Sequence, residues 1–342
     1  MSLPPLRFEP LLKARAWGGR GLEHFGRRLS ANATIGESWD LADLPPSIAE
    51  GISTVAEGPL QGRTLAEIRE QDGESLLGGL SVARTGGVPI LIKLLDARDN
   101  LSVQVHPDPA YARAHPEAYV KNEAWYVLQA EPDAVIYRGV DPSIDAHRFR
   151  RDLERERVLE DLVRIPVRRG DCIRLPSGIC HALGAGVLVA EVQTPSDTTF
   201  RVWDWNRHDP ARPLHLDQAM ACMRFGDDQD DGRPPVVRTE QAPSTVHHDC
   251  RFGRICETDD FTIHHVGVET DSPRTVPILR SDAPTVLTGV AGASRVVDER
   301  GRSARLAPGD TVLVPAAHAN ASLELPPDAQ ALWVDLGSRS AW

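Results

Sequence analysis

The stretch RRGDCIRLPSGICHALGAGVLVAEV, residues 168–192, decides how the rest of the chain is interpreted. It contains a Gly-Asp pair, a short apolar run, a proline and then a histidine. The stretch LAPGDTVLVPAAHANASLEL, residues 306–325, has the same features in the same order. The histidine follows the proline by five residues in the first copy and by three in the second. This internal repeat predicts two β-rich domains of related design.

Short runs rich in β-branched residues occur around the first copy. Between glycine- and proline-marked turns, such runs are typical of antiparallel strands in a sandwich or barrel. Helical patterns interrupt them, and one begins with the capping-box pair Thr64 and Glu67. We therefore expect a mainly β fold with helical insertions. The expected strands lie within 88–95, 101–106, 124–130, 134–140, 164–176 and 186–193, and the expected helices within 64–79, 143–163 and 214–225.

The composition argues against several classes of protein. The 342 residues include 38 basic and 49 acidic side chains, a formal net charge of −11. This balance disfavours binding to nucleic-acid phosphates or to an anionic membrane. No apolar stretch approaches the ~20 residues of a membrane helix, and the N-terminus lacks a signal-peptide pattern. The five cysteines form no C-x-x-C pair, so we expect free thiols and a cytoplasmic protein.

An acidic segment that contains prolines, FGDDQDDGRPP, separates the two copies of the repeat. Like charges resist packing, and prolines stop a preceding helix. We predict a first domain over residues 1–225 with N-terminal and helical insertions, a linker over 226–235 and a second domain over 236–342. The second domain lacks a counterpart of the metal candidates described next. His318 is therefore expected to lack ligand partners, and the second domain to stabilise the first without a metal of its own.

Three segments supply the candidate metal-binding side chains, and two of them show strand spacing. Gln104 and His106 alternate along one expected strand and so project from one face. Lys121 and Glu123 are likewise two residues apart. His181 ends the first repeat copy, where a proline and a glycine direct the chain so that the imidazole can point inward. Two imidazoles, a carboxylate and an amide oxygen suit zinc or another divalent first-row metal.

These segments resemble the two metal motifs of the cupins, β-barrels that bind one metal among their strands. Together with others, they resemble class I mannose-6-phosphate isomerase in its short bacterial form. Five segments carry this likeness in the family's order: PLRFEPLLKARAWGG (5–19), IGESWDLADLP (35–45), PILIKLLDARDNLSVQVHPD (89–108), KNEAWYVL (121–128) and EVQTPSDTTFRVWDW (191–205). The resemblance implies two cupin-type β-barrel or jelly-roll domains, the first catalytic and the second degenerate. The C-terminal third matches less well, and it supports the fold more than the activity.

The resemblance also implies roles for individual residues. It implies one zinc ion per chain, held by Gln104, His106, Glu123 and His181. It implies catalytic roles for Arg201 and Lys121, and contacts with the substrate for Lys93, Ser102, Glu191 and Asp197. The implied reaction interconverts mannose 6-phosphate and fructose 6-phosphate through an enediol. The base stays open among Glu191, Asp197, zinc hydroxide and a neutral Lys121.

Two other functions remain compatible with these residues. One is an isomerase for another sugar phosphate, and the other is a non-catalytic metal- or sugar-binding cupin. Arg201 and Lys121 beside four metal ligands favour the enzyme, because a binding module can lose them. We expect a small-molecule sugar phosphate as partner, no nucleic acid and no membrane, and a monomer or weak homo-oligomer.

Overall fold

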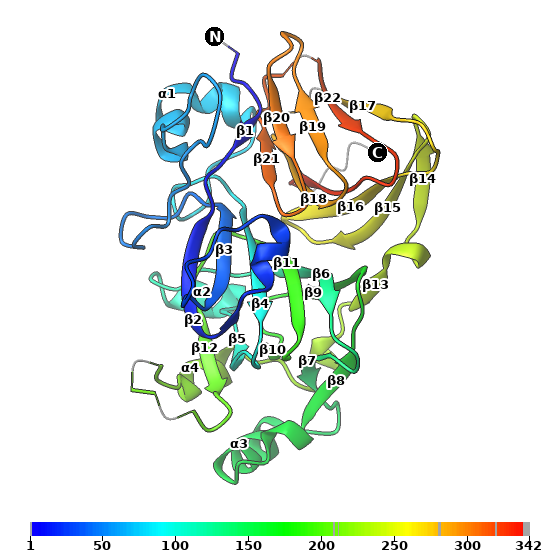
Figure 1. The fold of residues 1–342 in the computed structure, drawn as a ribbon. Coiled ribbons are helices and arrows are strands. Elements are labelled where there is room, and N and C mark those ends of the chain that lie inside the picture. The colour runs from blue at the N-terminus through cyan, green and yellow to red at the C-terminus, as the bar shows by residue number, and fades with distance from the viewer. Residues whose placement is uncertain (1, 208, 211, 280–281, 319, 338–342) are drawn as a thin grey trace.

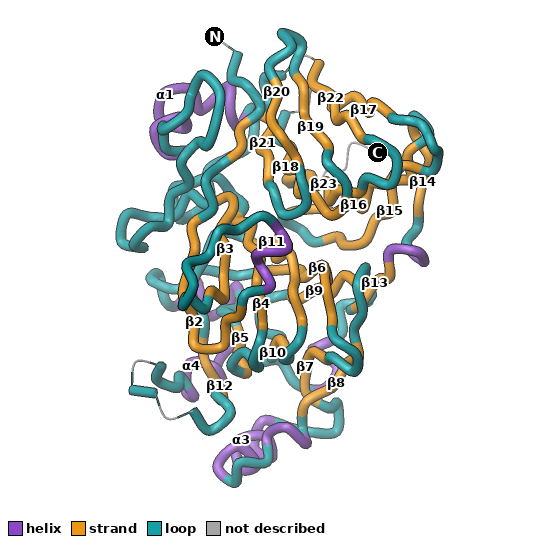
Figure 2. The backbone as a smooth tube through the Cα atoms, in the orientation of Figure 1, coloured by secondary structure: helices purple, strands orange, loops and turns teal. Residues whose placement is uncertain are grey.

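The computed structural model describes residues 2–337 apart from 208, 211, 280–281 and 319. In these residues, antiparallel strands form two sheets of seven strands, one of five and one of four. Apart from β1, which lies beside β21 in the upper half, the blue-to-green strands form the lower half of the molecule in Figure 1, and the yellow-to-red strands lie in the upper half. Short helices and loops connect the strands (Figure 2). The expected mainly β fold with helical insertions is confirmed.

Each half combines a seven-stranded sheet with a smaller one. In the lower half the large sheet contains, in spatial order, β13 (Val236–Arg238), β9 (Asp171–Leu175), β6 (Glu123–Ala130), β11 (Val187–Gln193), β4 (Leu91–Ala97), β3 (Ile35–Leu41) and β2 (Leu11–Gly19). Its small sheet contains β12 (Phe200–Trp203), β5 (Val103–Val105), β10 (His181–Leu183), β7 (Val135–Val140) and β8 (Leu162–Pro166). In the upper half the large sheet contains β1 (Leu6–Arg7), β21 (Thr311–Val314), β18 (Thr285–Ala291), β23 (Gln330–Leu336), β16 (Phe261–Val268), β15 (Cys250–Glu257) and β14 (Ser244–His247). Its small sheet contains β17 (Arg274–Leu279), β22 (Asn320–Leu325), β19 (Ser294–Val297) and β20 (Ser303–Leu306).

The expected helices form, but they are shorter than their sequence patterns. The helices are α1 (Leu65–Leu77), α2 (Pro109–Ala114), α3 (Ala146–Glu154) and α4 (Leu216–Cys222), with 3-10 turns at Gly21–Phe25, Val158–Glu160, Gly226–Gln229 and Thr239–Gln241. None of the described helices is long and apolar enough to cross a membrane. The capping box of α1 is confirmed, because Thr64 and Glu67 each accept a hydrogen bond from the other's backbone amide.

The charged run 143–163 is only partly the helix we expected. After α3 ends, Glu156 adopts a left-handed φ of 57°, which interrupts the helical path. Val158 and Leu162 then return to the core against Phe149 of α3. The expectation of one continuous helix was therefore wrong, because a turn lets two apolar residues pack inward.

Strand alternation gives the large sheet of the lower half two buried faces. On β4, Ile92 and Leu94 belong to the core shared with the upper half, whereas Lys93 lines a cavity on the opposite face. On β6, Tyr126 belongs to the shared core, and Glu123 is an odd number of residues away. Because successive side chains of a strand point to opposite faces, Glu123 and Lys93 project into the lower half.

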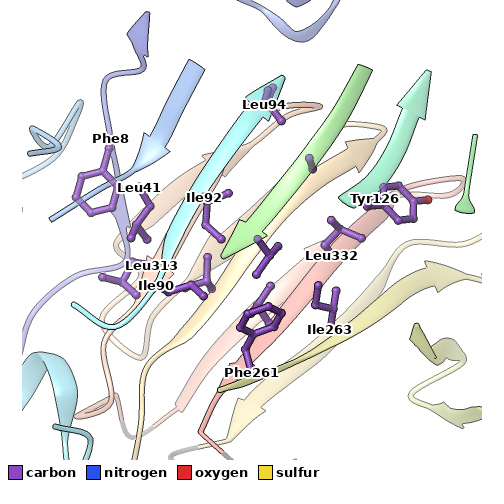
Figure 3. Close-up of a cluster of buried hydrophobic side chains, with 14 of the residues drawn as sticks. Phe8, Leu41, Ile90, Ile92, Leu94, Tyr126, Phe261, Ile263, Leu313 and Leu332 are labelled. Carbon is purple, nitrogen blue, oxygen red and sulfur yellow. The ribbon is translucent and has the colours of Figure 1, made fainter. Parts of the chain in front are cut away.

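The largest hydrophobic core lies between the two seven-stranded sheets. Figure 3 shows Ile92 and Tyr126 from the lower sheet near Ile263 and Leu332 from the upper one. Burial of apolar area stabilises folded proteins by about 25 cal/mol per Å², so this contact couples the stability of the two halves. The site in the lower half therefore rests on a sheet whose other face is covered by the upper half.

The two copies of the repeat fold into the same turn. Gly170 and Gly309 have left-handed φ values of 91° and 85°, which glycine adopts at little cost. The aspartate that follows each glycine accepts a hydrogen bond from the backbone amide three residues earlier. The distances are 3.0 Å for Asp171 and 2.9 Å for Asp310. The sequence repeat therefore corresponds to a repeated structural unit, which begins β9 in one half and β21 in the other.

The strand beside each of these units comes from the other half of the chain. β1 pairs with β21, and β13 pairs with β9. An arginine of each visiting strand lies near the turn aspartate of its partner: Arg7 is 3.9 Å from Asp310, and Arg238 is 3.6 Å from Asp171. We call this arrangement of β1 and β13 the strand exchange. β1 precedes the predicted linker at 226–235 and pairs in the upper half, whereas β13 follows the linker and pairs in the lower half. The predicted domain boundary stays a prediction.

Candidate metal centre and adjoining cavity

Three buried side chains converge inside the lower half. His106 directly follows β5, Glu123 begins β6 and His181 begins β10. Each is at most 1% exposed, and one potential ligand atom from each lies within 4.8 Å of the others. Glu123 Oε1 is 3.0 Å from His181 Nε2, and Glu123 Oε2 is 3.5 Å from His106 Nε2. The fold thus brings together three of the four predicted metal ligands.

Gln104, the fourth predicted ligand, lies beside this group. It is opposite His181 of β10 on one side and opposite Arg201 of β12 on the other. Its amide nitrogen is 3.4 Å from His181 Nε2. Ser102 lies two residues earlier, and its hydroxyl is 3.4 Å from the amide oxygen of Gln104. The strand register therefore aligns His181, Gln104 and Arg201 in one row across three neighbouring strands.

The donor set fits a divalent metal ion. His106 Nδ1 is 3.0 Å from the carbonyl of Thr198, and His181 Nδ1 is 2.8 Å from the carbonyl of Ile179. An Nδ1–H donated to a carbonyl leaves the Nε2 lone pair available to a metal. Burial, and then the charge of Lys121, lowers the pKa of His106 to about 3. The imidazole is therefore neutral, as a metal ligand must be.

A chain of alternating charges leads away from Glu123. Lys121 Nζ is 2.5 Å from Glu123 Oε2 and 3.9 Å from Glu191. Lys93 lies opposite Glu191 on the neighbouring strand, and its Nζ is 3.2 Å from that carboxylate. Burial opposes the charge of Lys121, but Glu123 and Glu191 outweigh burial and raise its pKa. Burial also opposes the charge of Glu123, yet Lys121 holds the pKa of that carboxyl well below its usual range.

A cavity of about 520 Å³ opens beside these groups. Its lining includes every residue that we predicted to be catalytic or to contact the substrate: Lys93, Ser102, Lys121, Glu191, Asp197 and Arg201. Gln104 also lines the cavity, and the buried triad contacts it through Gln104 and Lys121. The predicted residues therefore meet around a single space of a size suited to a small ligand.

Arg201 brings a partly unused guanidinium to the cavity. Its Nη1 donates to the carbonyl of Pro213 at 2.9 Å, while its buried Nε has no hydrogen-bond acceptor among the described residues. Arg212 lines the same cavity and pairs with Asp204 at 3.0 Å. Burial, and then Arg212, lowers the pKa of Arg201, but arginine remains a cation near neutrality. Arg201 can therefore donate further hydrogen bonds to an anionic group in the cavity.

The sequence analysis missed one wall of the cavity. Lys13, Arg15 and Trp17 alternate along β2, and Glu37 and Trp39 alternate along β3; all five line the cavity. Alternate residues on paired strands share a face. This period of two was the available signal, and both strands belong to segments that carry the family resemblance.

A second group of potential ligands occurs in the upper half, at Asp298, Glu299 and His318. Asp298 already accepts hydrogen bonds from the amides of Arg300 and Arg302 and from Arg302 Nε. His318 Nδ1 is 3.3 Å from Glu299. His318 therefore has acidic neighbours that the sequence did not lead us to expect. The expectation that this half holds no metal stays a prediction.

Comparisons with known proteins extend the family resemblance. Residues 6–136 match the family model described as phosphomannose isomerase type I, catalytic domain. Mannose-6-phosphate isomerase ManA of Bacillus subtilis (strain 168) is 38% identical over 253 residues, which are 73% of this chain and 73% of that protein. The mannose-6-phosphate isomerase of Streptococcus mutans serotype c is 36% identical over 230 residues, 65% of this chain and 68% of its own length.

Solved structures match over nearly the whole length. The crystal structure of the mannose 6-phosphate isomerase from Bacillus subtilis has a TM-score of 0.82 at 25% identity and covers 98% of this chain and 100% of that one. A putative mannosephosphate isomerase from Archaeoglobus fulgidus has a TM-score of 0.75 at 21% identity, with 98% and 99% coverage. The second match concerns the fold alone. Both halves of the molecule are thus present in solved structures.

Proposed function

The chain belongs to the type I phosphomannose isomerase family, and on that premise we propose that it interconverts mannose 6-phosphate and fructose 6-phosphate with one bound zinc ion. The observation that carries the proposal is one piece of geometry. His106, Glu123 and His181 converge behind a cavity that Lys121 and Arg201 line. A metal-binding module needs the three ligands but not the two cations, so their presence together favours catalysis.

The proposed reaction moves the C2 proton of the open-chain aldose to C1 and the hydroxyl proton of O2 to O1, through a cis-enediol. Gln104, His106, Glu123 and His181 would hold the zinc ion, which would supply Lewis-acid stabilisation of developing negative charge. Arg201 donates a charged hydrogen bond to the same developing charge from the cavity wall. Because Lys121 lies between Glu123 and Glu191, it acts as a cationic donor to a sugar oxygen and not as a neutral base.

Two carboxylates remain as candidates for the base. Glu191 is buried, accepts a hydrogen bond from Trp125 Nε1 at 2.9 Å and pairs with Lys93. Asp197 is exposed and lines the cavity. We propose that one of them transfers the proton and that Lys93 and Ser102 donate to the substrate. Comparison of Glu191→Gln with Asp197→Asn separates the two, because loss of the base lowers kcat far more than loss of a binding contact.

The test is conversion of mannose 6-phosphate to fructose 6-phosphate by protein that has been stripped with a chelator and then reloaded with zinc. We expect activity to disappear and return, with one zinc per chain by elemental analysis. Glu123→Gln removes a ligand and should lose the metal, whereas the matched control Asp298→Asn, in the upper half, should retain it. If the zinc-loaded protein binds mannose 6-phosphate without converting it, the chain is a binding module. If the protein converts only a different sugar phosphate, the substrate assignment is wrong.

Isotope transfer tests the enediol. If the reaction runs in D₂O and the transferred proton exchanges with solvent, deuterium appears at C1 of fructose 6-phosphate. Direct hydride transfer leaves the product free of deuterium. Mass spectrometry of the product distinguishes these outcomes.

A further inference from the structure

One wall of the cavity is a loop instead of a strand. Ile48 and Ala49 lie between β3 and α1, and both line the cavity. The Ile48 amide donates to the carbonyl of Pro45 at 2.9 Å, and the Gly51 amide donates to the carbonyl of Ile48 at 3.1 Å. These bonds shape the loop internally. We call residues 45–50 the wall loop.

Lys13 of β2 ties the wall loop to the sheet. Its Nζ is 3.3 Å from the carbonyl of Ala49, 3.1 Å from the carbonyl of Glu50 and 3.1 Å from the carboxylate of Glu50. Three acceptors match the three N–H donors of an ammonium group. The Lys13 side chain is only 11% exposed, although that of Glu50 is 76% exposed, so it is the lysine that is held within the structure.

Two features mark this contact as a built anchor. Glu50 has a left-handed φ of 51°, a conformation that non-glycine residues adopt at a cost. Lys13 binds the carbonyl of that same residue. Lys13 Nζ also lies 5.0 Å from the centre of a Trp39 ring, and Lys93 Nζ lies 5.0 Å from a Trp39 ring. A cation over an aromatic ring gains electrostatic stabilisation.

The anchor lies far along the charge network from the metal centre. Lys13 contacts Trp39, which contacts Lys93, which pairs with Glu191. Only beyond Glu191 does the network reach Lys121 and the ligand Glu123. Trp39 and Lys93 thus separate Lys13 from Glu191, one of the two candidate bases.

We propose that Lys13 is a positioning residue that holds the wall loop against the bound sugar phosphate and so sets the affinity and selectivity of the site. It acts through Ile48 and Ala49 and does not touch the reacting atoms. The proposal rests on the proposed function for the identity of the substrate. The claim that Lys13 holds the wall loop in place does not depend on the proposed function, because the state of the loop can be measured without substrate.

The central variant is Lys13→Met, which keeps the apolar stem and removes all three donors. We expect KM for mannose 6-phosphate to rise about tenfold while kcat stays within about twofold, because binding contacts are lost and the chemical step is not. Zinc content should stay at the wild-type level. Lys13→Arg should restore part of the affinity, since a guanidinium can donate to the same carbonyls.

Arg20→Met is the matched control. Like Lys13, Arg20 binds loop carbonyls: its Nη1 lies within hydrogen-bonding distance of those of Ser30, Ala31 and Ala33, but Arg20 does not line the active-site cavity. Its loss should leave KM unchanged.

Hydrogen exchange of the substrate-free protein supplies the second measurement. The amides of Ile48 and Gly51 should exchange faster in Lys13→Met and at the wild-type rate in Arg20→Met. Unchanged exchange, or faster exchange with an unchanged KM, overturns the proposal. A fall in kcat together with loss of zinc also overturns it, because Lys13 would then support the metal centre. If the wild-type protein fails to isomerise mannose 6-phosphate, the proposed function falls while the exchange test still decides whether Lys13 anchors the loop.

Discussion

At the scale of single residues, Arg201 differs from the other cations around the cavity. Lys13, Lys93 and Lys121 each have a carboxylate partner, as do Arg15 and Arg212. Among the described residues, Arg201 forms no ion pair. Its positive charge is therefore the least neutralised at the cavity and the most available to a substrate.

We predict that Arg201→Ala retains zinc and loses about 10²- to 10³-fold in kcat, the range seen when one charge-stabilising donor is removed from an active site. Elemental analysis and steady-state kinetics provide the measurement. Arg201→Lys keeps the charge without the planar fork and should recover only part of the rate. If kcat of the alanine variant equals that of the wild type, Arg201 has no role in the chemical step. Loss of zinc would show that it acts through Gln104, its cross-strand neighbour.

Asp40 provides a prediction about pH. Its carboxylate pairs with Arg27 at 2.7 Å and is 4% exposed. Burial outweighs Arg27 and Ser38 and raises its pKa to about 6, above the ~3.9 of an unfolded chain. The folded state therefore binds more protons than the unfolded state between about pH 4 and 6. By linkage, this group makes stability fall as pH rises through that window.

The measurement is urea unfolding of wild type and Asp40→Asn from pH 4 to 7. The amide does not titrate, so the wild-type free energy of unfolding should fall relative to the variant by about 2–3 kcal/mol as pH rises to 6. Above that window the difference should be constant. Parallel curves across the whole range would show that folding leaves the pKa of Asp40 at its unfolded value.

At the scale of elements, runs rich in β-branched residues between turns predicted strands of the lower half, and one capping box predicted the start of α1. Those signals are local, because each depends on residues within a few positions of one another. The register that assembles the site is not local: His181 lies beside Gln104 from 77 residues away. The resemblance supplied those partners in advance, since spacing alone cannot show which strands pair. It did not draw attention to Lys13 or to the wall loop, whose contacts are between backbone and side chain.

The equivalent turns before β9 and β21 allow the stability cost of replacing a turn glycine to be compared at two positions. Gly170→Ala and Gly309→Ala both place a side chain at left-handed φ, which costs about 1 kcal/mol. A methyl at 170 meets only Thr239 at 3.7 Å, whereas one at 309 lies 2.8 Å from Phe25 Cβ and 2.9 Å from its carbonyl oxygen. Overpacking adds about 1–3 kcal/mol, so Gly309→Ala should be the less stable variant in urea. Equal losses would mean that the segment around Phe25 moves aside freely.

At the scale of the whole molecule, the shared core and the strand exchange join the two halves. A fragment of residues 1–225 lacks β13 and exposes Ile92 and Tyr126 on an uncovered sheet face. We predict that this fragment aggregates or remains unfolded. In the full chain, hydrogen exchange in dilute urea should report one free energy of opening for β6 and β16. Distinct values, or a folded and monomeric fragment, would show that the halves are independent domains.

The strand exchange also has a consequence for biosynthesis. β1 leaves the ribosome about 300 residues ahead of its partner β21, which corresponds to roughly 15–60 s at typical elongation rates of about 5–20 residues per second. Until then the edge of β1 has no native partner, and the lower sheet closes only when β13 emerges. Translation therefore determines the order in which the two sheets are completed, and β1 is among the last strands to be paired although it is synthesised before the other strands of its sheet.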